Sequence, residues 1–202
     1  MYRSLLALFA VAPLPAAPGP KDGAKEALYF PVTVGAKSVM EMTVSGTPAG
    51  PAMESVVTVT KVGEKGGTFR VTVQREYPGN PAAKNLVLVL EVSGRGLALV
   101  AAGGKNLDKP VVLVKLPVKP GDTWTNEDPR AGKVTVTVGK EEEVEVPAGK
   151  YKALVVVSEM NPGGRPAKTT SWYAAGVGLV RSVTTYNGFD TTDVLKSFAP
   201  GK

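Results

Sequence analysis

The sequence predicts a single all-β domain, in which a curved antiparallel sheet of about a dozen strands forms a half-barrel, a barrel or a sandwich. Apolar and polar residues alternate with a period of two in many short segments, which is typical of strands with one buried face. The 202 residues include 23 glycines and 17 prolines, which separate these segments. Between Leu28 and Phe198, no segment combines a helical apolar period with capping residues.

The N-terminus has the pattern of a secretory signal peptide. Arg3 precedes a short apolar run, and a proline-rich stretch with small residues follows it. The run is shorter than the ~20 residues that span a bilayer. We predict a signal peptide over residues 1–17, a Pro/Gly-rich leader over 18–27 and the antiparallel β domain over 28–202. The mature chain should begin between Pro13 and Asp22 and be periplasmic or secreted. A buried N-terminal helix is the alternative.

Three segments show the alternation of half-buried strands most clearly: residues 40–44, 68–74 and 133–138. Valine and threonine, which favour a pleated surface, are frequent in them. The side chains predicted to face the core are Met40, Met42 and Val44, then Phe69, Val71 and Val73, then Val134, Val136 and Val138.

Glycine-containing turns should join the strands. A Val-Gly-x-(Lys/Glu) pattern recurs at residues 34–37, 62–65 and 138–141, and each occurrence predicts a hairpin turn. Three further turns are expected at residues 93–96, 147–149 and 187–188.

Three runs are apolar at every position instead of alternating: Leu86–Leu90, Val111–Val114 and Ala153–Val157. A strand that is apolar on both faces needs a second cover. One interpretation is a central strand covered by the tail or a loop, and the other is the wall of an apolar groove. For the second interpretation, the candidate ligand-binding residues are Leu88, Leu113, Val155, Trp124, Trp172 and Tyr173. The alternative for both tryptophans is a mostly buried scaffold role at the ends of the sheet.

The composition excludes most common catalytic chemistry. The chain contains no cysteine and no histidine, so disulfides, thiol nucleophiles and histidine-based triads are excluded, as are the usual zinc and haem sites. It also lacks a Gly-x-Ser-x-Gly elbow, a Ser-x-x-Lys pair and a phosphate loop. We therefore expect no catalytic residue and no cofactor.

Two acidic segments are candidate sites. Glu141, Glu143 and Glu145 should share the wet face of a strand, where carboxylates keep their ordinary behaviour. A second group of oxygen donors should lie on a loop, but its spacing matches no complete calcium motif. Its members are Asp122, Asn126, Glu127 and Asp128. No metal site is expected.

The charge pattern argues against nucleic acid as a partner. The formal net charge is +6, with 24 Lys and Arg against 18 Asp and Glu, and the basic residues are spread along the chain. After the N-terminal run, no segment is long and apolar enough for stable membrane insertion.

Three phrases in the C-terminal half resemble those of a family of bacterial exported β-proteins of unknown function, many of which are lipoproteins. They are Pro117–Trp124, which reads Pro-x-Lys-Pro-Gly-Asp-x-Trp, a Val-Pro-Ala-Gly hairpin at Val146–Gly149, and Trp-Tyr-Ala-x-Gly-Val-Gly at Trp172–Gly178. The resemblance implies a curved antiparallel sheet or half-barrel akin to periplasmic carriers of lipids or lipoproteins. The chain departs from the lipoprotein members because it lacks the acylated cysteine.

The sequence thus favours a non-catalytic extracytoplasmic β domain that binds an apolar ligand or a lipidated partner. Its partner would be an apolar small molecule, a lipid or an envelope protein. An alternative is a structural or interaction protein of the cell envelope, which predicts a filled interior. A hydrolase is a lower alternative, because it needs convergent Ser, Lys, Tyr or carboxylate groups.

Overall fold

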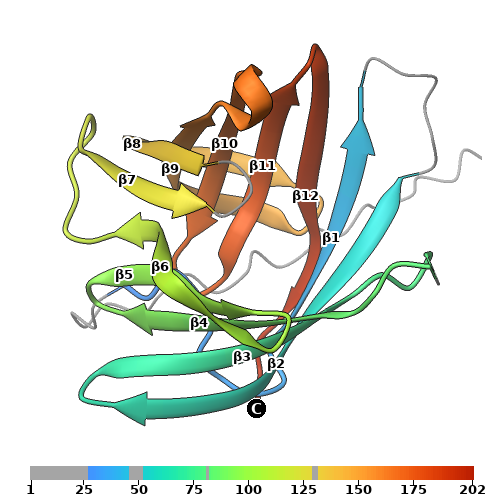
Figure 1. Ribbon diagram of the computed structural model, residues 1–202. Coiled ribbons are helices and arrows are strands. Elements are labelled where there is room, and N and C mark those ends of the chain that lie inside the picture. Colours follow the sequence, from blue (N-terminus) through green and yellow to red (C-terminus); the bar gives the residue numbers. More distant parts are fainter. Residues whose placement is uncertain (1–26, 46–51, 81, 129–131) are drawn as a thin grey trace, which may run out of the picture.

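The computed structural model describes residues 27–45, 52–80, 82–128 and 132–202. The predicted signal peptide and nearly all of the leader lie outside these residues. One sheet of twelve strands forms the molecule, with the spatial order β6-β5-β4-β3-β2-β1-β12-β11-β10-β9-β8-β7 (Figure 1). The strands are β1 (Lys37–Val44), β2 (Met53–Lys65), β3 (Thr68–Glu76), β4 (Leu86–Ser93), β5 (Gly96–Ala102), β6 (Lys105–Lys115), β7 (Thr123–Asp128), β8 (Gly132–Val146), β9 (Gly149–Met160), β10 (Ala167–Ala174), β11 (Gly178–Tyr186) and β12 (Phe189–Ala199).

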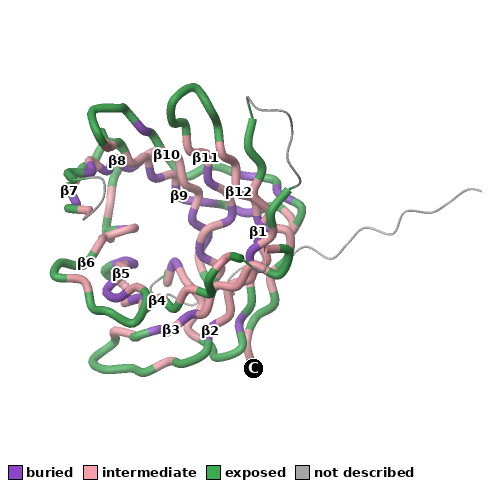
Figure 2. Tube along the Cα trace, turned by 45° about the vertical axis from the view of Figure 1, so that its right-hand side comes forward, coloured by how far each residue is buried: buried purple, intermediate pink, exposed green. Residues whose placement is uncertain are grey.

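The sheet rolls up until its two end strands, β6 and β7, lie beside each other, so that the molecule is a nearly closed barrel (Figure 2). Each pairing in the sheet is antiparallel, which confirms the all-β fold with about a dozen strands. Among the described residues, the helical part is one short 3₁₀ turn, Pro162–Gly164, and no helix is long and apolar enough to cross a membrane.

The first hydrophobic core fills one half of the barrel. It joins side chains from opposite walls, including Val71 and Val92 on one side and Val136 and Val156 on the other, all at most 2% exposed. We call the face of the sheet that carries these side chains the inner face. The predicted alternation is confirmed on β3 and β8, because the apolar positions of both strands lie in this core or pack against it.

The segment that precedes β1 closes this half of the barrel. Tyr29 and Ala36 are buried in the first core, and Phe30 packs against it. Backbone hydrogen bonds fix the segment, since the Gly176 N–H donates to the Leu28 carbonyl at 2.7 Å. A Cβ on Gly178 would lie 3.0 Å from the Phe30 ring, so this glycine permits the close approach.

The predicted hairpin turn at residues 138–141 is wrong, because β8 runs through them. The ladder with β9 instead contains a bulge between Val138 and Glu141. A Cβ on Gly139 would lie only 2.9 Å from the Cβ of Val155. Glycine is needed here because Val155 occupies the space above it, and a bulge accommodates the extra residue without ending the strand.

Past this bulge, the β8–β9 hairpin buries the opposite face of the sheet. In β9 the buried positions change from Val156 and Leu154 to Ala153 and Tyr151. The hairpin tip reaches β12, where the Ala148 N–H donates to the Leu195 carbonyl at 3.1 Å. A second hydrophobic core forms around this contact. Its buried members are Met40, Val144, Val146, Tyr151, Ala153, Ala174, Val180 and Leu195.

The other turn predictions have mixed outcomes. The turns near 93–96, 147–149 and 187–188 are confirmed, each lying between two antiparallel neighbours. Residues 62–65 belong to β2, and the turn falls one step later, at Gly66 and Gly67, whose φ angles of 59° and 76° suit glycine. Residues 34–37 form a turn that leads into β1 and joins no two strands.

The three apolar runs differ in how their second faces are covered. On β4, Leu90 is buried in the first core, while Val87 on the outer face is 42% exposed. On β9, the two faces are buried in the two cores. The run on β6 lies on a strand at the end of the sheet, where Pro110 fits because an edge position needs no N–H donor there.

Candidate functional site

The half of the barrel opposite the N-terminal segment is open, and strand ends lie around it in place of the first core. Because β1 begins at that segment and ends at Val44, the end of β1, the start of β2, the end of β11 and the start of β12 lie together at the open end. Val44 pairs with Thr191, Met42 pairs with Met53, and Tyr186 pairs with Phe189.

Exposed apolar side chains gather at this end. Six large hydrophobic residues of the described chain are exposed, and four of them are here: Val44 (42%), Met53 (42%), Tyr186 (37%) and Phe189 (42%). Apolar residues of this size are normally buried or scattered, so their grouping on neighbouring strand ends points to a contact surface.

These side chains lie on the inner face. Val44 and Met42 have the same parity on β1 as Met40. Met40 pairs with Ser55, which has the parity of Val59 in the first core. On β12, Phe189 has the parity of Asp193, which pairs with Met42. We call Met42, Val44, Met53, Tyr186 and Phe189 the inner mouth.

A cation lies on the inner face next to the inner mouth. Arg75 has the parity of Val71 and Val73 on β3. Its Nε and Nη2 atoms donate to the Ser55 Oγ at 3.1 and 2.9 Å, and its guanidinium lies 5.4 Å from the centre of the Tyr77 ring. Within the part of the chain that the structure describes, Arg75 forms no ion pair.

An anion lies on the same face, on β12. Asp193 pairs with Met42 on one side and with Ser182 on the other, and it accepts a hydrogen bond from the Ser182 Oγ at 3.2 Å. It too has no ion-pair partner among the described residues. The serines therefore act as hydrogen-bond partners of the two inner charges.

Charges on the outer face are paired more often. Lys196 contacts Glu41 at 3.0 Å and also Glu54, and these hydrogen bonds raise the pKa of the lysine. The pair of Lys152 and Glu141 has the inner-face parity of Leu154, and its contact at 2.7 Å raises the pKa of Lys152. The predicted wet face of residues 141–146 is confirmed, because the three odd-numbered glutamates are exposed while Val144 and Val146 are buried.

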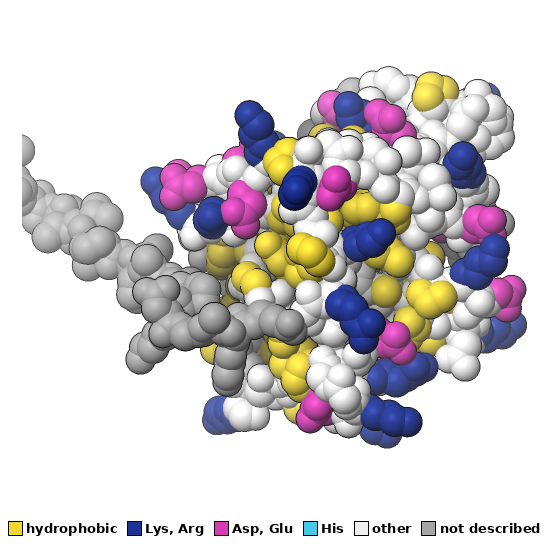
Figure 3. Space-filling model, turned by 90° about the vertical axis from the view of Figure 1, so that its left-hand side faces the viewer, with side chains coloured by type: hydrophobic (Ala, Val, Ile, Leu, Met, Phe, Trp, Pro, Cys, Tyr) yellow, Lys and Arg dark blue, Asp and Glu magenta, His cyan; other side chains and the backbone are white. Residues whose placement is uncertain are grey.

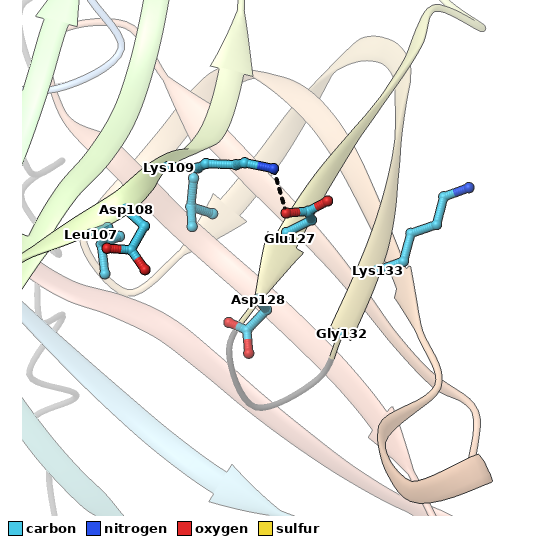
Figure 4. A pocket seen from close by; sticks show the side chains of 8 residues that line it. Leu107, Asp108, Lys109, Glu127, Asp128, Gly132 and Lys133 are labelled. Carbon is cyan, nitrogen blue, oxygen red and sulfur yellow. Dashed lines mark hydrogen bonds and ion pairs between the residues drawn. The ribbon is translucent and has the colours of Figure 1, made fainter.

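Two recesses flank the seam between β6 and β7. The first, of about 560 Å³, is lined mainly by charged side chains, with Leu107, Val111 and Gly132 between them (Figure 4). Lys109 points toward Glu127 and contacts it at 2.7 Å, and this bond raises the lysine pKa and lowers that of the carboxyl. Lys133 extends away from the pair (Figure 4). So polar a lining does not suit an apolar ligand.

The second recess, of about 420 Å³, is lined by Trp124, Val112 and residues of the β4–β5 turn, among others. The face of the molecule turned toward the viewer in Figure 3 has apolar side chains between Lys, Arg and acidic side chains. The charges of both signs are interspersed on it, and no basic patch forms there.

Asn126, Glu127 and Asp128 do not lie on the predicted oxygen-rich loop, because they form the end of β7. As strand residues they face alternately, so Asn126 is buried while Glu127 is exposed. No group of three or more metal-ligating side chains occurs among the residues that the structure describes.

The six candidate ligand-binding residues do not form one site. Tyr173 is part of the first core, and Leu88, Leu113 and Trp124 are half-buried against it. Burial raises the pKa of Tyr173 to about 12. Val155 and Trp172 pair with each other and lie on the opposite face of the sheet. There the Arg181 guanidinium lies 5.0 Å from the centre of the Trp172 ring.

The residues of the inner mouth and its two charges were not identified from the sequence, apart from the inward positions of Met42 and Val44. One signal was present for Arg75, which is the next inward position after Phe69, Val71 and Val73. Met53, Tyr186 and Phe189 carried no such signal, since only the pairing of β1 with both β2 and β12 brings them together.

Comparison with known proteins agrees with the fold. The model of the DUF3108-like family matches residues 128–195. A candidate exported protein of Bacteroides fragilis with a YmcC-like fold superposes with a TM-score of 0.61 at 18% identity, over 86% of this chain and 99% of that one. A candidate lipoprotein of Parabacteroides distasonis gives a TM-score of 0.59 at 14% identity, over 87% of this chain and 100% of the other. No curated protein matches. At these identities the likeness establishes the shared barrel architecture.

Proposed function

We propose that this chain is a non-catalytic, extracytoplasmic barrel domain that binds an apolar ligand, or the lipid group of a lipidated partner, at its inner mouth. The observation that carries the proposal is the grouping of exposed apolar side chains on the inner face at one end of the barrel. On the outside of the barrel such residues would be ordinary surface scatter, but on a concave face they can surround a guest.

The extracytoplasmic location is supported by two independent features. The N-terminal sequence has a signal-peptide pattern. The two superposed structures are a candidate exported protein and a candidate lipoprotein. We therefore place the chain outside the cytoplasm.

Binding of a neutral apolar probe tests the proposal. We expect the exported, purified chain to bind N-phenyl-1-naphthylamine with a fluorescence increase. Phe189→Ser should lower the affinity by roughly tenfold, since burial of one large apolar side chain contributes about 1.5–3 kcal/mol. Val87→Ser is the matched control, because Val87 has the same 42% exposure on the outer face.

The proposal fails if the wild-type chain does not bind the probe, or if Val87→Ser lowers the affinity as much as Phe189→Ser does. The first result would favour the second candidate, a structural or interaction protein of the envelope. That candidate is supported by the tight filling of the barrel at its closed end, where Val71 and Val92 are fully buried.

A further inference from the structure

We infer that the ligand of the inner mouth is a single-chain amphiphile with a carboxylate headgroup, a fatty acid, and that Arg75 binds the carboxylate. This inference rests on the proposed function and specifies its substrate class. It starts from the placement of a cation on the inner face, next to an apolar surface.

The guanidinium of Arg75 is held in place by Ser55, but not all of its N–H donors have hydrogen-bond partners. Its Nε and Nη2 atoms share the Ser55 Oγ, which fixes one edge of the planar group. Ser55 is itself 4% exposed and pairs with Met40 of the second core, so the support is rigid. Nη1 donates to no described atom and is not buried. One face of the fork therefore remains open to an anion.

The charge of Arg75 is also uncompensated. The structure describes no carboxylate within 4.0 Å of it, whereas Arg70, on the outer face of the same strand, contacts Glu91 at 3.3 Å. A half-buried cation beside apolar side chains is costly until an anion pairs with it. One guanidinium matches one carboxylate in charge and in geometry.

Asp193 is the acidic side chain on the inner face that could affect the charge of Arg75 and of a bound headgroup. It lies on β12, with β1 and β2 between it and β3, and it is hydrogen-bonded to Ser182. It does not neutralise Arg75, because two strands separate the two residues, and one guanidinium balances one negative charge. A monoanionic carboxylate is therefore favoured over a phosphate dianion.

The register gives the orientation of the ligand. Arg75 bonds to Ser55, which lies two residues deeper along β2 than Met53 of the inner mouth. That separation is roughly 7 Å along an extended strand. The carboxylate would enter first, and the chain would then run outward over Met42, Met53 and Val44 toward Phe189.

Headgroup-matched ligands test the inference. We expect laurate to displace N-phenyl-1-naphthylamine from the wild-type chain at least tenfold more effectively than dodecanol, which has the same chain without the charge. Arg75→Met should remove this preference by weakening laurate binding much more than dodecanol binding. Arg70→Met is the matched control and should keep the preference, because Arg70 lies on the outer face of the same strand.

The outcomes separate the two proposals. If wild type binds dodecanol and laurate equally, or if Arg75→Met weakens both ligands equally, the headgroup assignment is overturned while the apolar mouth stands. If neither ligand binds, the proposed function itself fails. Should Arg75→Met not fold, Arg75→Lys keeps the charge but loses the fork, and we expect it to retain part of the preference. An Arg75→Lys variant with the full wild-type preference would refute a fork-specific contact.

Discussion

The carboxamide of Asn126 makes two hydrogen bonds with the backbone of Val112. Its Nδ2 donates to the Val112 carbonyl at 2.9 Å, and the Val112 N–H donates to its Oδ1 at 3.0 Å. The Trp124 Nε1 also donates to the Val112 carbonyl, at 3.0 Å. A neighbouring strand would make similar bonds through its peptide groups, so two side chains of β7 replace part of a ladder at the seam with β6. The seam thereby covers two edges that would otherwise invite pairing with other chains.

Replacing Asn126 should therefore destabilise the barrel. Asn126→Leu keeps the volume but leaves the Val112 N–H without its partner, while the Val112 carbonyl keeps the bond from Trp124. We expect a loss of roughly 1–3 kcal/mol in the free energy of unfolding. Urea denaturation measures the loss. Asn106→Leu on exposed β6 is the control and should change stability little. Equal stabilities of the two variants would show that the seam does not depend on the carboxamide.

The all-β fold could be predicted because local signals agree with it. The alternation of Phe69, Val71 and Val73 requires only that one face of a strand be buried. The bulge at Gly139 could not be predicted, because a glycine between a valine and charged residues has the same local pattern in a hairpin turn. What distinguishes the two is Val155, which lies on another strand and packs over the glycine.

Less of the candidate site could be predicted from the sequence, because it also depends on residues from different strands. Apolar character alone points to Leu88 and Tyr173, and it mostly identifies core residues. Tyr173 is buried in the first core, and Leu88 packs against it. The inner mouth depends on which strand ends meet at the open end. Tyr186 and Phe189 flank an Asn-Gly turn and read locally as turn neighbours, and only the closure of β12 onto β1 brings them to Val44.

Alkaline pH should destabilise the fold through its buried tyrosines. Burial raises the pKa of Tyr173 to about 12, from 10.0 for an exposed tyrosine, and it also raises the pKa values of Tyr29 and Tyr151. Because the folded state holds these protons more tightly, stability is unaffected below pH 10 and falls as the pH rises from about 10 to 12.

Tyr173→Phe should reduce that loss. A shift of two pKa units corresponds to roughly 3 kcal/mol at most, so the variant should lose less stability between pH 9 and pH 11.5 than wild type does. Urea midpoints at both pH values provide the measurement. Tyr186→Phe is the control, because Tyr186 is exposed. Parallel pH dependence in wild type and Tyr173→Phe would assign the alkaline loss to other groups.

The tryptophans should act as scaffold residues. Trp124 is half-buried against the first core and bonds to the Val112 carbonyl, and Trp172 packs against the second core and donates to Glu142. Truncation of a large core ring costs ~3–5 kcal/mol when burial is complete. We expect Trp124→Ala and Trp172→Ala to lower the melting temperature. A variant that kept its melting temperature but lost probe binding would instead place that ring in a ligand site.

Gly139 should tolerate no larger residue unless Val155 is reduced. A Cβ at position 139 would lie 2.9 Å from the Val155 Cβ and 3.1 Å from its Cγ1, which is closer than carbon atoms pack. Gly139→Ala should therefore destabilise the barrel by roughly 1–3 kcal/mol, as overpacking does. Gly63→Ala is the matched control, since Gly63 also lies within a strand but its added Cβ would meet no atom within 4 Å.

A double-mutant cycle decides whether this clash is the cause. Val155→Ala alone should destabilise, because it opens space above the bulge, but Gly139→Ala combined with Val155→Ala should be more stable than the two separate losses predict. Thermal or urea unfolding of the four chains gives the coupling free energy. If the two losses simply added, the methyl group at position 139 would be acting through the backbone of the bulge, and the packing of Val155 would not be what requires glycine there.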